Sequence, residues 1–210
     1  MKLRHYWLLA ILLPCLAVAG SDDAGPFKAG EDYDVLAKPI PTESGDKVEV
    51  LELFWYGCPH CYKLEPHLEH WEANMPENTM YRRLPAVFRP PWLIHAKAFY
   101  AAEAMGVLDK MHKPLFDALH AQKRDIYDEK SIIKFVAELG IDSEQFAKTY
   151  RSFAVQTKAN RAKQMTGRYR IRGVPAIIIN GKYRTGTAKA KGEERLIQVI
   201  NALVAKENGK

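Results

Sequence analysis

Cysteine is scarce in this sequence, which has only Cys15, Cys58 and Cys61 among 210 residues. Internal repeats and low-complexity tracts are also missing, which excludes a repeat protein and a largely disordered chain. A strong charge of either sign is absent too: 31 basic and 25 acidic residues leave a net charge of +6, which indicates no particular acidic partner. The composition is ordinary for a globular protein, with 47% hydrophobic and 27% charged residues, and it predicts one domain or one domain with an insertion.

Long hydrophobic runs are absent as well, and the apolar run Leu8–Val18 is too short to span a bilayer as a permanent helix. Lys2 and Arg4 precede this run, and the small residues Ala17 and Ala19 end it, which is the pattern of a cleavable secretory signal. The alternative is an anchoring helix, but the charged, glycine-containing stretch after Ala19 cannot extend the run. We therefore expect residues 1–19 to be a signal peptide cleaved after about Ala19. Loss of Lys2 and Arg4 lowers the net charge from +6 to +4.

Cleavage of this segment removes Cys15, so the mature chain keeps a single cysteine pair, Cys58 and Cys61. A lipoprotein would need a small residue before Cys15, and Pro14 stands there instead. In an oxidising compartment the remaining pair could be a structural disulfide. Closing so short a loop, however, removes little entropy from the unfolded chain. The spacing of the two sulfurs therefore favours redox chemistry.

The pattern of the mature chain predicts an α/β fold that is interrupted by helices. The segment 20–46 is polar and is expected to be extended. The middle of the chain, from about 92 to 165, shows only helical periodicity and indicates an inserted helical domain. Before the insert the sequence predicts β-α-β, with strands at 48–54 and 80–88 and a helix between them that begins at the cysteines. After the insert it predicts β-β-α, with a hairpin of 175–179 and 182–185 around Asn180-Gly181 and a helix at about 192–206.

A cysteine pair at the start of a helix has the chemistry that thiol–disulfide exchange needs. The attacking sulfur must be a thiolate, and a second thiol must lie close enough to resolve the mixed disulfide. At the helix start, free N–H groups and the positive end of the helix dipole favour the Cys58 thiolate. Pro59 suits the first turn because it needs no N–H donor there. His60 can add positive charge or a donor, and Cys61 is expected to be shielded and resolving.

Three other uses of this motif fit the sequence less well. A zinc site would need a second pair of ligands, and only His67 and His70 lie close together on the same predicted helix. Covalent haem attachment needs a histidine directly after the second cysteine, where Tyr62 stands. A peroxidase usually separates its two cysteines widely. We therefore expect neither a metal nor another cofactor.

The segment Phe54–Cys61, with the sequence FWYGCPHC, resembles the active-site segment of the DsbA family, bacterial periplasmic disulfide oxidases of the thioredoxin superfamily. The helical insert is similar to the arrangement in that family. Gly173-Val174-Pro175 before a strand resembles the superfamily's cis-proline loop. The dipeptide Pro59-His60 is specific within the superfamily, because thioredoxin-type reductases typically carry Gly-Pro there. The resemblance covers nearly the whole mature chain.

This resemblance implies a thioredoxin fold over residues 20–90 and 164–210, with the helical domain inserted at 91–163. It implies an enzyme that oxidises cysteine pairs of newly exported proteins by transferring its Cys58–Cys61 disulfide. The expected location is the periplasm, and the expected reoxidising partner is a quinone-linked inner-membrane oxidase of the DsbB type. A monomer without nucleic-acid partners is expected.

Two acidic residues near the motif are candidates for proton transfer. Glu52 interrupts the apolar strand six residues before Cys58. It could face outward as a surface acid. It could instead be a partly buried carboxylate that takes the proton of Cys61, as the matching acid is thought to do in the family. So short a run does not decide between these two interpretations. Glu65 is a weaker candidate and is expected to be a surface charge.

Pro175 could simply begin a strand, a common position for proline. Within Gly173-Val174-Pro175, beside this motif, we expect a cis peptide bond and a Val174 backbone that pairs with an extended substrate. Trp55 and Tyr56 are expected to line the groove beside the sulfurs, with core packing of one of them as an equal alternative. The alternating Arg168, Arg170 and Arg172 are expected to be a solvated surface.

Two rival functions remain. The first is an isomerase or reductase, but such periplasmic enzymes are often dimeric through an added domain, and no such domain fits before Val48. The second is a binding module or chaperone that has kept the fold without redox activity. The intact pair of Cys58 and Cys61 speaks against it.

Overall fold

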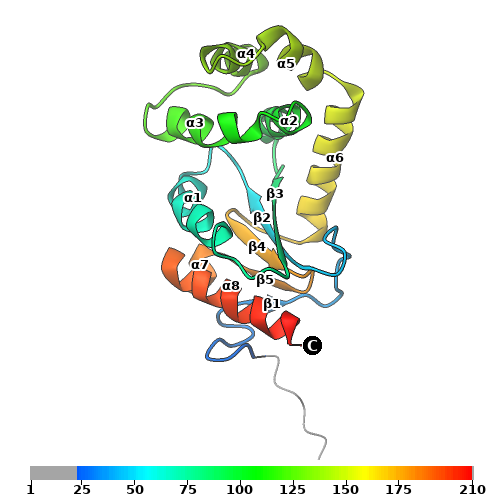
Figure 1. Ribbon diagram of the computed structural model, residues 1–210, viewed down its shortest axis with the longest axis vertical. Coiled ribbons are helices and arrows are strands. Elements are labelled where there is room, and N and C mark those ends of the chain that lie inside the picture. Colours follow the sequence, from blue (N-terminus) through cyan, green and yellow to red (C-terminus); the bar gives the residue numbers. More distant parts are fainter. Residues whose placement is uncertain (1–22, 210) are drawn as a thin grey trace, which may run out of the picture.

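The computed structural model describes residues 23–209, so the expected signal peptide and Cys15 lie outside the described residues. The centre of the molecule is a five-stranded sheet in the order β1-β5-β4-β2-β3 (Figure 1). Only β2 and β3 are parallel, and all other neighbours are antiparallel. The strands are β1 (Asp34–Val35), β2 (Val48–Phe54), β3 (Thr79–Pro85), β4 (Ala176–Ile179) and β5 (Tyr183–Thr185). The strand β1, which pairs with β5, lies in the segment 20–46, where extended chain but no strand was predicted.

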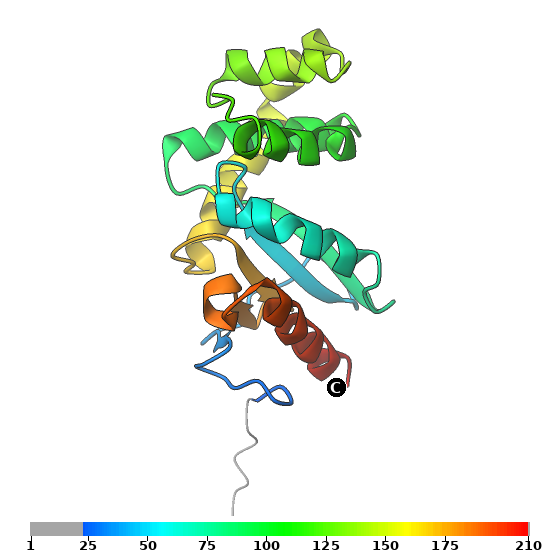
Figure 2. The same ribbon diagram turned by 90° about the vertical axis from the view of Figure 1, so that its left-hand side faces the viewer.

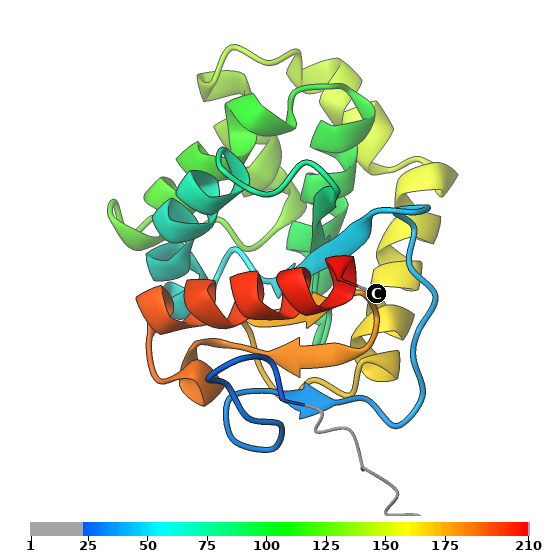
Figure 3. The same cartoon turned by 60° about the horizontal axis from the view of Figure 1, so that its bottom comes forward.

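Strand β2 is buried along its whole length because helices cover both faces of the sheet. Its even-numbered residues, including Val50 and Glu52, face α1 (Pro59–Glu72) and α8 (Glu193–Asn208). Leu51 and Leu53 face α6 (Phe153–Arg168). Figure 3 shows α8 crossing the front of the sheet while α6 lies behind it. Glu52 lies on the same face as Val50, so it points toward the helix that carries the cysteines and is buried there.

The predicted hairpin is present, and its turn is the one that Asn-Gly favours. Asn180 and Gly181 both have positive φ, at 50° and 62°, as the central residues of a type I′ turn do, and the N–H of Lys182 donates to the carbonyl oxygen of Ile179. Ile179 pairs with Tyr183, so β5 begins one residue later than the predicted strand at 182–185. A Cβ added to Gly181 would lie 1.9 Å from the carbonyl oxygen of Ile40. The turn therefore needs glycine both for its backbone angle and for its close contact with the extended segment before β2.

The predicted helical insert is present above the sheet (Figures 1 and 2). It packs around an apolar core that also includes Phe54, Tyr56 and both cysteines. Asp142 caps the helix Ser143–Tyr150, since its carboxylate accepts the N–H groups of Glu144 and Gln145. The full reciprocal capping box lies one helix earlier, between Asp128 and Ser131. The helices between β3 and β4 are α2 (Pro90–Ala104), α3 (Leu108–His120), α4 (Glu129–Glu138), α5 (Ser143–Tyr150) and α6.

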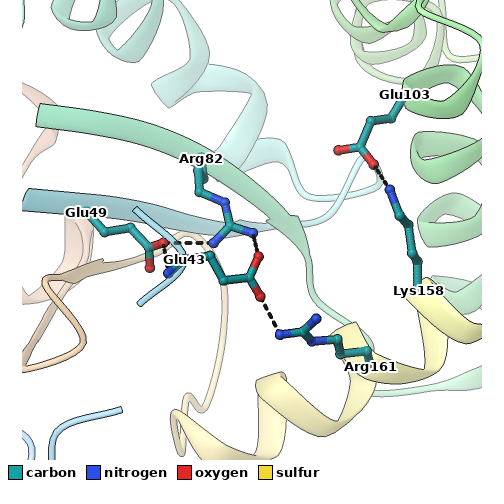
Figure 4. A network of polar contacts seen from close by, with 6 residues as sticks. All are labelled: Glu43, Glu49, Arg82, Glu103, Lys158 and Arg161. Atoms are coloured by element: carbon teal, nitrogen blue, oxygen red, sulfur yellow. Dashed lines mark hydrogen bonds and ion pairs between the residues drawn. The ribbon is translucent and has the colours of Figure 1, made fainter. Parts of the chain in front are cut away.

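Helix α6 belongs to both parts of the molecule, since it descends from the insert along one face of the sheet (Figure 1). A chain of ion pairs strengthens this connection (Figure 4). Arg82 on β3 binds Glu49 at 2.7 Å and also Glu43, which in turn binds Arg161 on α6. The expected boundary between residues 163 and 164 falls inside this continuous helix, so the two-domain division stays a proposal.

The remaining described helix, α7 (Thr187–Ala190), is a single turn before α8. Residues 23–209 include no helix with the length and apolar character needed to cross a membrane.

Candidate active site

The two cysteines occupy the first turn of α1, at the carboxyl end of β2. Cys58 is the residue that caps this helix, with extended backbone angles, and Pro59 is in the first turn as predicted. The backbone N–H of Cys61 donates to Cys58 Sγ at 3.3 Å. The helix N-terminus therefore directs one of its unpaired donors at the sulfur that the sequence predicts to attack.

The two sulfurs differ in exposure and acidity. Both are free thiols, with Cys58 at 7% exposed and Cys61 fully buried. The pKa of Cys58 is lowered to about 6, and the largest cause is the hydrogen bond that the Cys61 thiol donates to it. The backbone N–H groups of Cys61 and His60 and the charge of His60 lower this pKa further, while burial opposes the shift. Burial raises the pKa of Cys61 well above its usual value. At neutral pH the pair therefore holds one thiolate, on the more exposed sulfur.

The cis-proline loop lies directly against the attacking sulfur. The peptide bond between Val174 and Pro175 is cis, as expected. Cys58 Sγ lies 3.4 Å from the carbonyl oxygen of Val174 and donates to it as a thiol. Gly173, Val174 and Pro175 line a groove of about 850 Å³ that also includes the exposed His60. The four residues that the sequence assigned to substrate contact and redox poise thus surround one depression beside Cys58.

Glu52 is a buried carboxylate, fully shielded from solvent. Tyr81 donates a hydrogen bond of 2.6 Å to Glu52 Oε2, and Arg83 Nε lies 3.7 Å from the same oxygen. Burial, and then the negative charge of Glu65, raise the pKa of Glu52 to about 8 although Arg83 and Tyr81 oppose the shift. Oε1 has no hydrogen-bond partner among residues 23–209. Of the two interpretations that the sequence left open, the outward-facing surface acid is wrong.

The expectation that Glu65 is a surface charge is also wrong. Glu65 is 3% exposed, and its Oε1 contacts Arg83 Nη2 and His112 Nε2, both at 3.0 Å. Burial opposes ionisation of this carboxyl, but the hydrogen bond from His112 and the charges of His112 and Arg83 outweigh it and lower the pKa of Glu65. Glu65 faces inward because it shares the buried side of α1 with Cys61, Leu64 and Leu68.

Sequence reasoning did not single out Arg83 or His112, which complete this buried network. His112 Nδ1 forms a 2.8 Å hydrogen bond with the hydroxyl of Tyr56, so the network links α1, β3 and α3. One signal was available for His112, because it lies at helical spacing from the apolar residues Leu115 and Leu119. For Arg83 the signal is its register, directly beside Glu52 across the parallel pair of β2 and β3.

The two aromatic residues before the motif have different roles. Tyr56 is fully buried and packs in the core of the insert. Trp55 is partly exposed and stacks on Trp92, with ring centroids 4.2 Å apart. A Cβ at Gly57 would lie 2.4 Å from the indole of Trp55. Glycine at this position therefore allows the Trp55 ring to lie flat against the loop that leads to Cys58.

The site combines a cysteine pair at a helix N-terminus, a lowered pKa at one of the two sulfurs, and a cis-proline loop that faces this sulfur. These features define a thiol–disulfide oxidoreductase of the thioredoxin fold. Comparison with known proteins identifies the family. The model of the DSBA-like thioredoxin domain family matches residues 82–203, and the chain belongs to that family. The matched range begins after the cysteines, but the similarity to relatives that cover 98% of this chain extends over the segment that carries them.

Two such relatives are each named thiol:disulfide interchange protein DsbA. The protein of Azotobacter vinelandii is 41% identical over 86% of this chain and 85% of its own length. That of Pseudomonas aeruginosa is 36% identical over 98% of this chain and 97% of its own length. The crystal structure of P. aeruginosa DsbA superposes with a TM-score of 0.85 at 37% identity, covering 89% of this chain and 97% of that one. The family confirms the thioredoxin-like fold with a helical insertion and the disulfide-oxidising activity that the sequence predicts.

Proposed function

We propose that Cys58 is the sulfur that exchanges disulfides with substrate proteins and that Cys61 is the resolving sulfur. The observation that carries this assignment is the asymmetry of the pair. Cys58 is at the helix N-terminus, beside Val174 and with a lowered pKa, whereas Cys61 is fully buried with a raised pKa. Only Cys58 can meet a sulfur of another polypeptide.

In the oxidised enzyme a substrate thiolate attacks Cys58 Sγ, and the Cys58–Cys61 bond breaks as the mixed disulfide forms. Cys61 leaves with the electron pair of that bond. The second substrate thiol loses its proton to solvent and attacks the substrate sulfur of the mixed disulfide. Cys58 then leaves as a thiolate. The substrate has lost two electrons, and the enzyme has gained them.

In this scheme Glu52 exchanges a proton with the buried sulfur of Cys61. With its pKa raised to about 8, Glu52 holds a proton at neutral pH and can give it to Cys61 as that sulfur is released. The negative charge of an ionised Glu52 raises the pKa of Cys61, which supports their proximity in the interior. This transfer leaves Glu52 as a carboxylate, which takes the proton back from Cys61 when the disulfide re-forms.

The backbone of Val174 presents the substrate to Cys58. Its carbonyl oxygen lies 3.4 Å from the attacking sulfur, so an extended polypeptide that pairs with this loop brings its cysteine into line. Main-chain pairing depends little on the side chains of the substrate. One enzyme of this kind can therefore act on many proteins.

The low pKa of Cys58 also gives the reaction its direction, because a disulfide is a strong oxidant when its reduced form is stabilised. His60 also makes the disulfide more oxidising, since its charge lowers the pKa of Cys58. We propose that the substrates are newly exported, incompletely folded proteins with reduced cysteines, and that the enzyme works in the periplasm as a monomer. A quinone-linked inner-membrane oxidase of the DsbB type then takes up the two electrons.

Equilibration with glutathione buffers tests the direction. The Cys58–Cys61 couple should be clearly more oxidising than thioredoxin, whose potential is about −270 mV. A potential near that value would contradict the oxidase and favour a reductase.

Two variants test the roles of the sulfurs. Cys58→Ser should be unable to form a mixed disulfide with a reduced substrate. Cys61→Ser should trap one on Cys58, because the resolving thiol is missing. Trapping by Cys58→Ser and none by Cys61→Ser would reverse the assignment.

A further inference from the structure

The groove beside Cys58 is lined by many more basic than acidic side chains. It is formed by the cis-proline loop, the start of α1 and the turn between β5 and α8. Asp34 and Glu193 are its only acidic lining residues among those the structure describes. Five permanently charged cations line it, in addition to His60: Lys63, Arg170, Arg172, Arg184 and Lys189.

Three of these cations form ion pairs within the protein. Asp34 binds both Arg184, at 2.9 Å, and Lys189, at 2.6 Å. Lys63 binds Glu193 at 3.2 Å. Both anions of the groove are therefore already occupied, and Asp34 is shared between two cations.

Arg170 and Arg172 have no such partner. Both are exposed, and within residues 23–209 neither guanidinium takes part in a hydrogen bond or an ion pair. The backbone carbonyl of Arg170 instead accepts a 2.7 Å hydrogen bond from Arg184, which anchors this part of the loop to β5. The two guanidinium groups thus project from an anchored segment and remain available to a ligand.

Their position in the chain places these charges where a substrate has to lie. Arg172 precedes Val174 by two residues, and Val174 carries the carbonyl oxygen 3.4 Å from Cys58 Sγ. Arg170, Arg172 and Val174 all line the same groove. A polypeptide that pairs with this loop while its cysteine reaches Cys58 therefore brings neighbouring side chains close to Arg172 and, further along, to Arg170.

We infer that the groove selects polypeptide substrates that carry acidic side chains within a few residues of the reacting cysteine, through Arg170 and Arg172. This inference rests on the proposed function and adds a specificity to it. Main-chain pairing at Val174 accepts any sequence, and the two arginines add a preference for negative charge. The same charges would disfavour a segment with Lys or Arg beside its cysteine.

The expected preference is modest because both guanidinium groups are exposed to solvent. Two exposed ion pairs of ordinary strength correspond to a change of about two- to thirty-fold in kcat/KM. Salt weakens such contacts, since charges are screened over about 8 Å at physiological ionic strength. The preference should therefore shrink when salt is added.

The test uses three reduced peptides that share two cysteines and differ only in the flanking positions, which are Asp, Asn or Lys. Oxidation by the full oxidised protein is followed for the wild type and for the double variant Arg170→Gln/Arg172→Gln. Acidic neighbours make a substrate thiol less reactive, so each rate is divided by the rate of the same peptide with glutathione disulfide. The ratio of the corrected rate for the Asp peptide to that for the Asn peptide should be about two- to thirty-fold higher in the wild type than in the double variant.

Arg168→Gln is the matched control, because Arg168 is exposed on the same stretch but lies outside the groove. It removes one positive charge and should leave the peptide ratios as in the wild type. Equal ratios in the wild type and the double variant would overturn the inference while the proposed function stands. If the wild type oxidised none of the peptides, the proposed function itself would fail.

Discussion

Cys58 Sγ lies 3.4 Å from the carbonyl oxygen of Val174, a residue 116 positions further along the chain. The contact joins the two segments that the sequence marks as functional, the cysteine motif and the Gly173-Val174-Pro175 loop. It arises because β2 and β4 are neighbours in the sheet, so the loop before β4 meets the helix that follows β2. The reactive sulfur and the backbone that presents the substrate are thus held by one rigid sheet.

The Cys61 thiol should be the principal donor that makes Cys58 acidic. Cys61→Ala removes this donor, so the pKa of Cys58 should rise from about 6 by about one to two units, the value of a hydrogen bond to a charged group. Cys61→Ser keeps a donor and should raise it less. Titration of thiolate absorbance in the near ultraviolet measures both. An unchanged midpoint in Cys61→Ala would show that the helix N-terminus suffices.

The reduced form should be more stable than the oxidised form by a margin that depends on pH. A thiol whose pKa is lowered by folding, here from 9.0 to about 6 for Cys58, adds stability that is complete above the unfolded pKa. This stability is lost as the pH falls through about 6. Denaturant unfolding of both redox forms from pH 5 to 9 should show the difference growing by about 1.4 kcal/mol per pH unit between about pH 6 and pH 9, with little change below pH 6. A constant difference would contradict the low pKa.

Glu52 should have the opposite effect on stability. Its pKa is raised from 4.5 to about 8, so its contribution is complete below 4.5 and is lost as the pH rises through about 8. Glu52→Gln cannot ionise, and it should therefore be more stable than the wild type at pH 9 but not at pH 4. Urea unfolding at both pH values measures this. Tyr81→Phe, which removes the 2.6 Å hydrogen bond to the carboxylate, should raise the pKa of Glu52 further.

The buried link from Tyr56 through His112 to Glu65 should matter for stability. His112→Ala leaves the hydroxyl of Tyr56 and one contact of Glu65 without a partner and opens a cavity. Its free energy of unfolding should fall by about 3 kcal/mol. Tyr56→Phe removes only one hydrogen bond and should cost about 1 kcal/mol. Urea unfolding of both variants compares the two losses, and equal losses would mean that the contact with Glu65 contributes little.

Gly57 should tolerate no side chain, because its Cβ would lie 2.4 Å from the Trp55 indole. Gly57→Ala has to displace the ring from Trp92 and should destabilise the protein by about 1–3 kcal/mol, as overpacking does. Gly167→Ala is the matched control, since no atom lies within 4 Å of a Cβ at this position in α6. It should stabilise by about 0.4–1 kcal/mol. Thermal unfolding checks both signs.

Local signals in the sequence were sufficient for much of the secondary structure. Strand β2 has the predicted bounds, and β3 ends at Pro85 rather than Phe88. The two-residue β1 was missed, because so short a strand exists only through its pairing with β5. The pattern of helices was recognisable from apolar spacing, but not the way in which α6 leaves the insert and packs against the sheet.

The sequence by itself determined the chemistry of the site: two sulfurs at a helix start, with Pro59 and His60 between them, are close together in any fold that forms this helix. It also determined the Asn180-Gly181 turn, because backbone angles there are a local property. Only the tertiary structure decided which acids are buried. Strand β2 is covered on both faces, so alternation cannot reveal where Glu52 points. Likewise, the partners of the buried Glu65 are Arg83 on β3 and His112 on α3, and such distant contacts depend on packing rather than on local sequence.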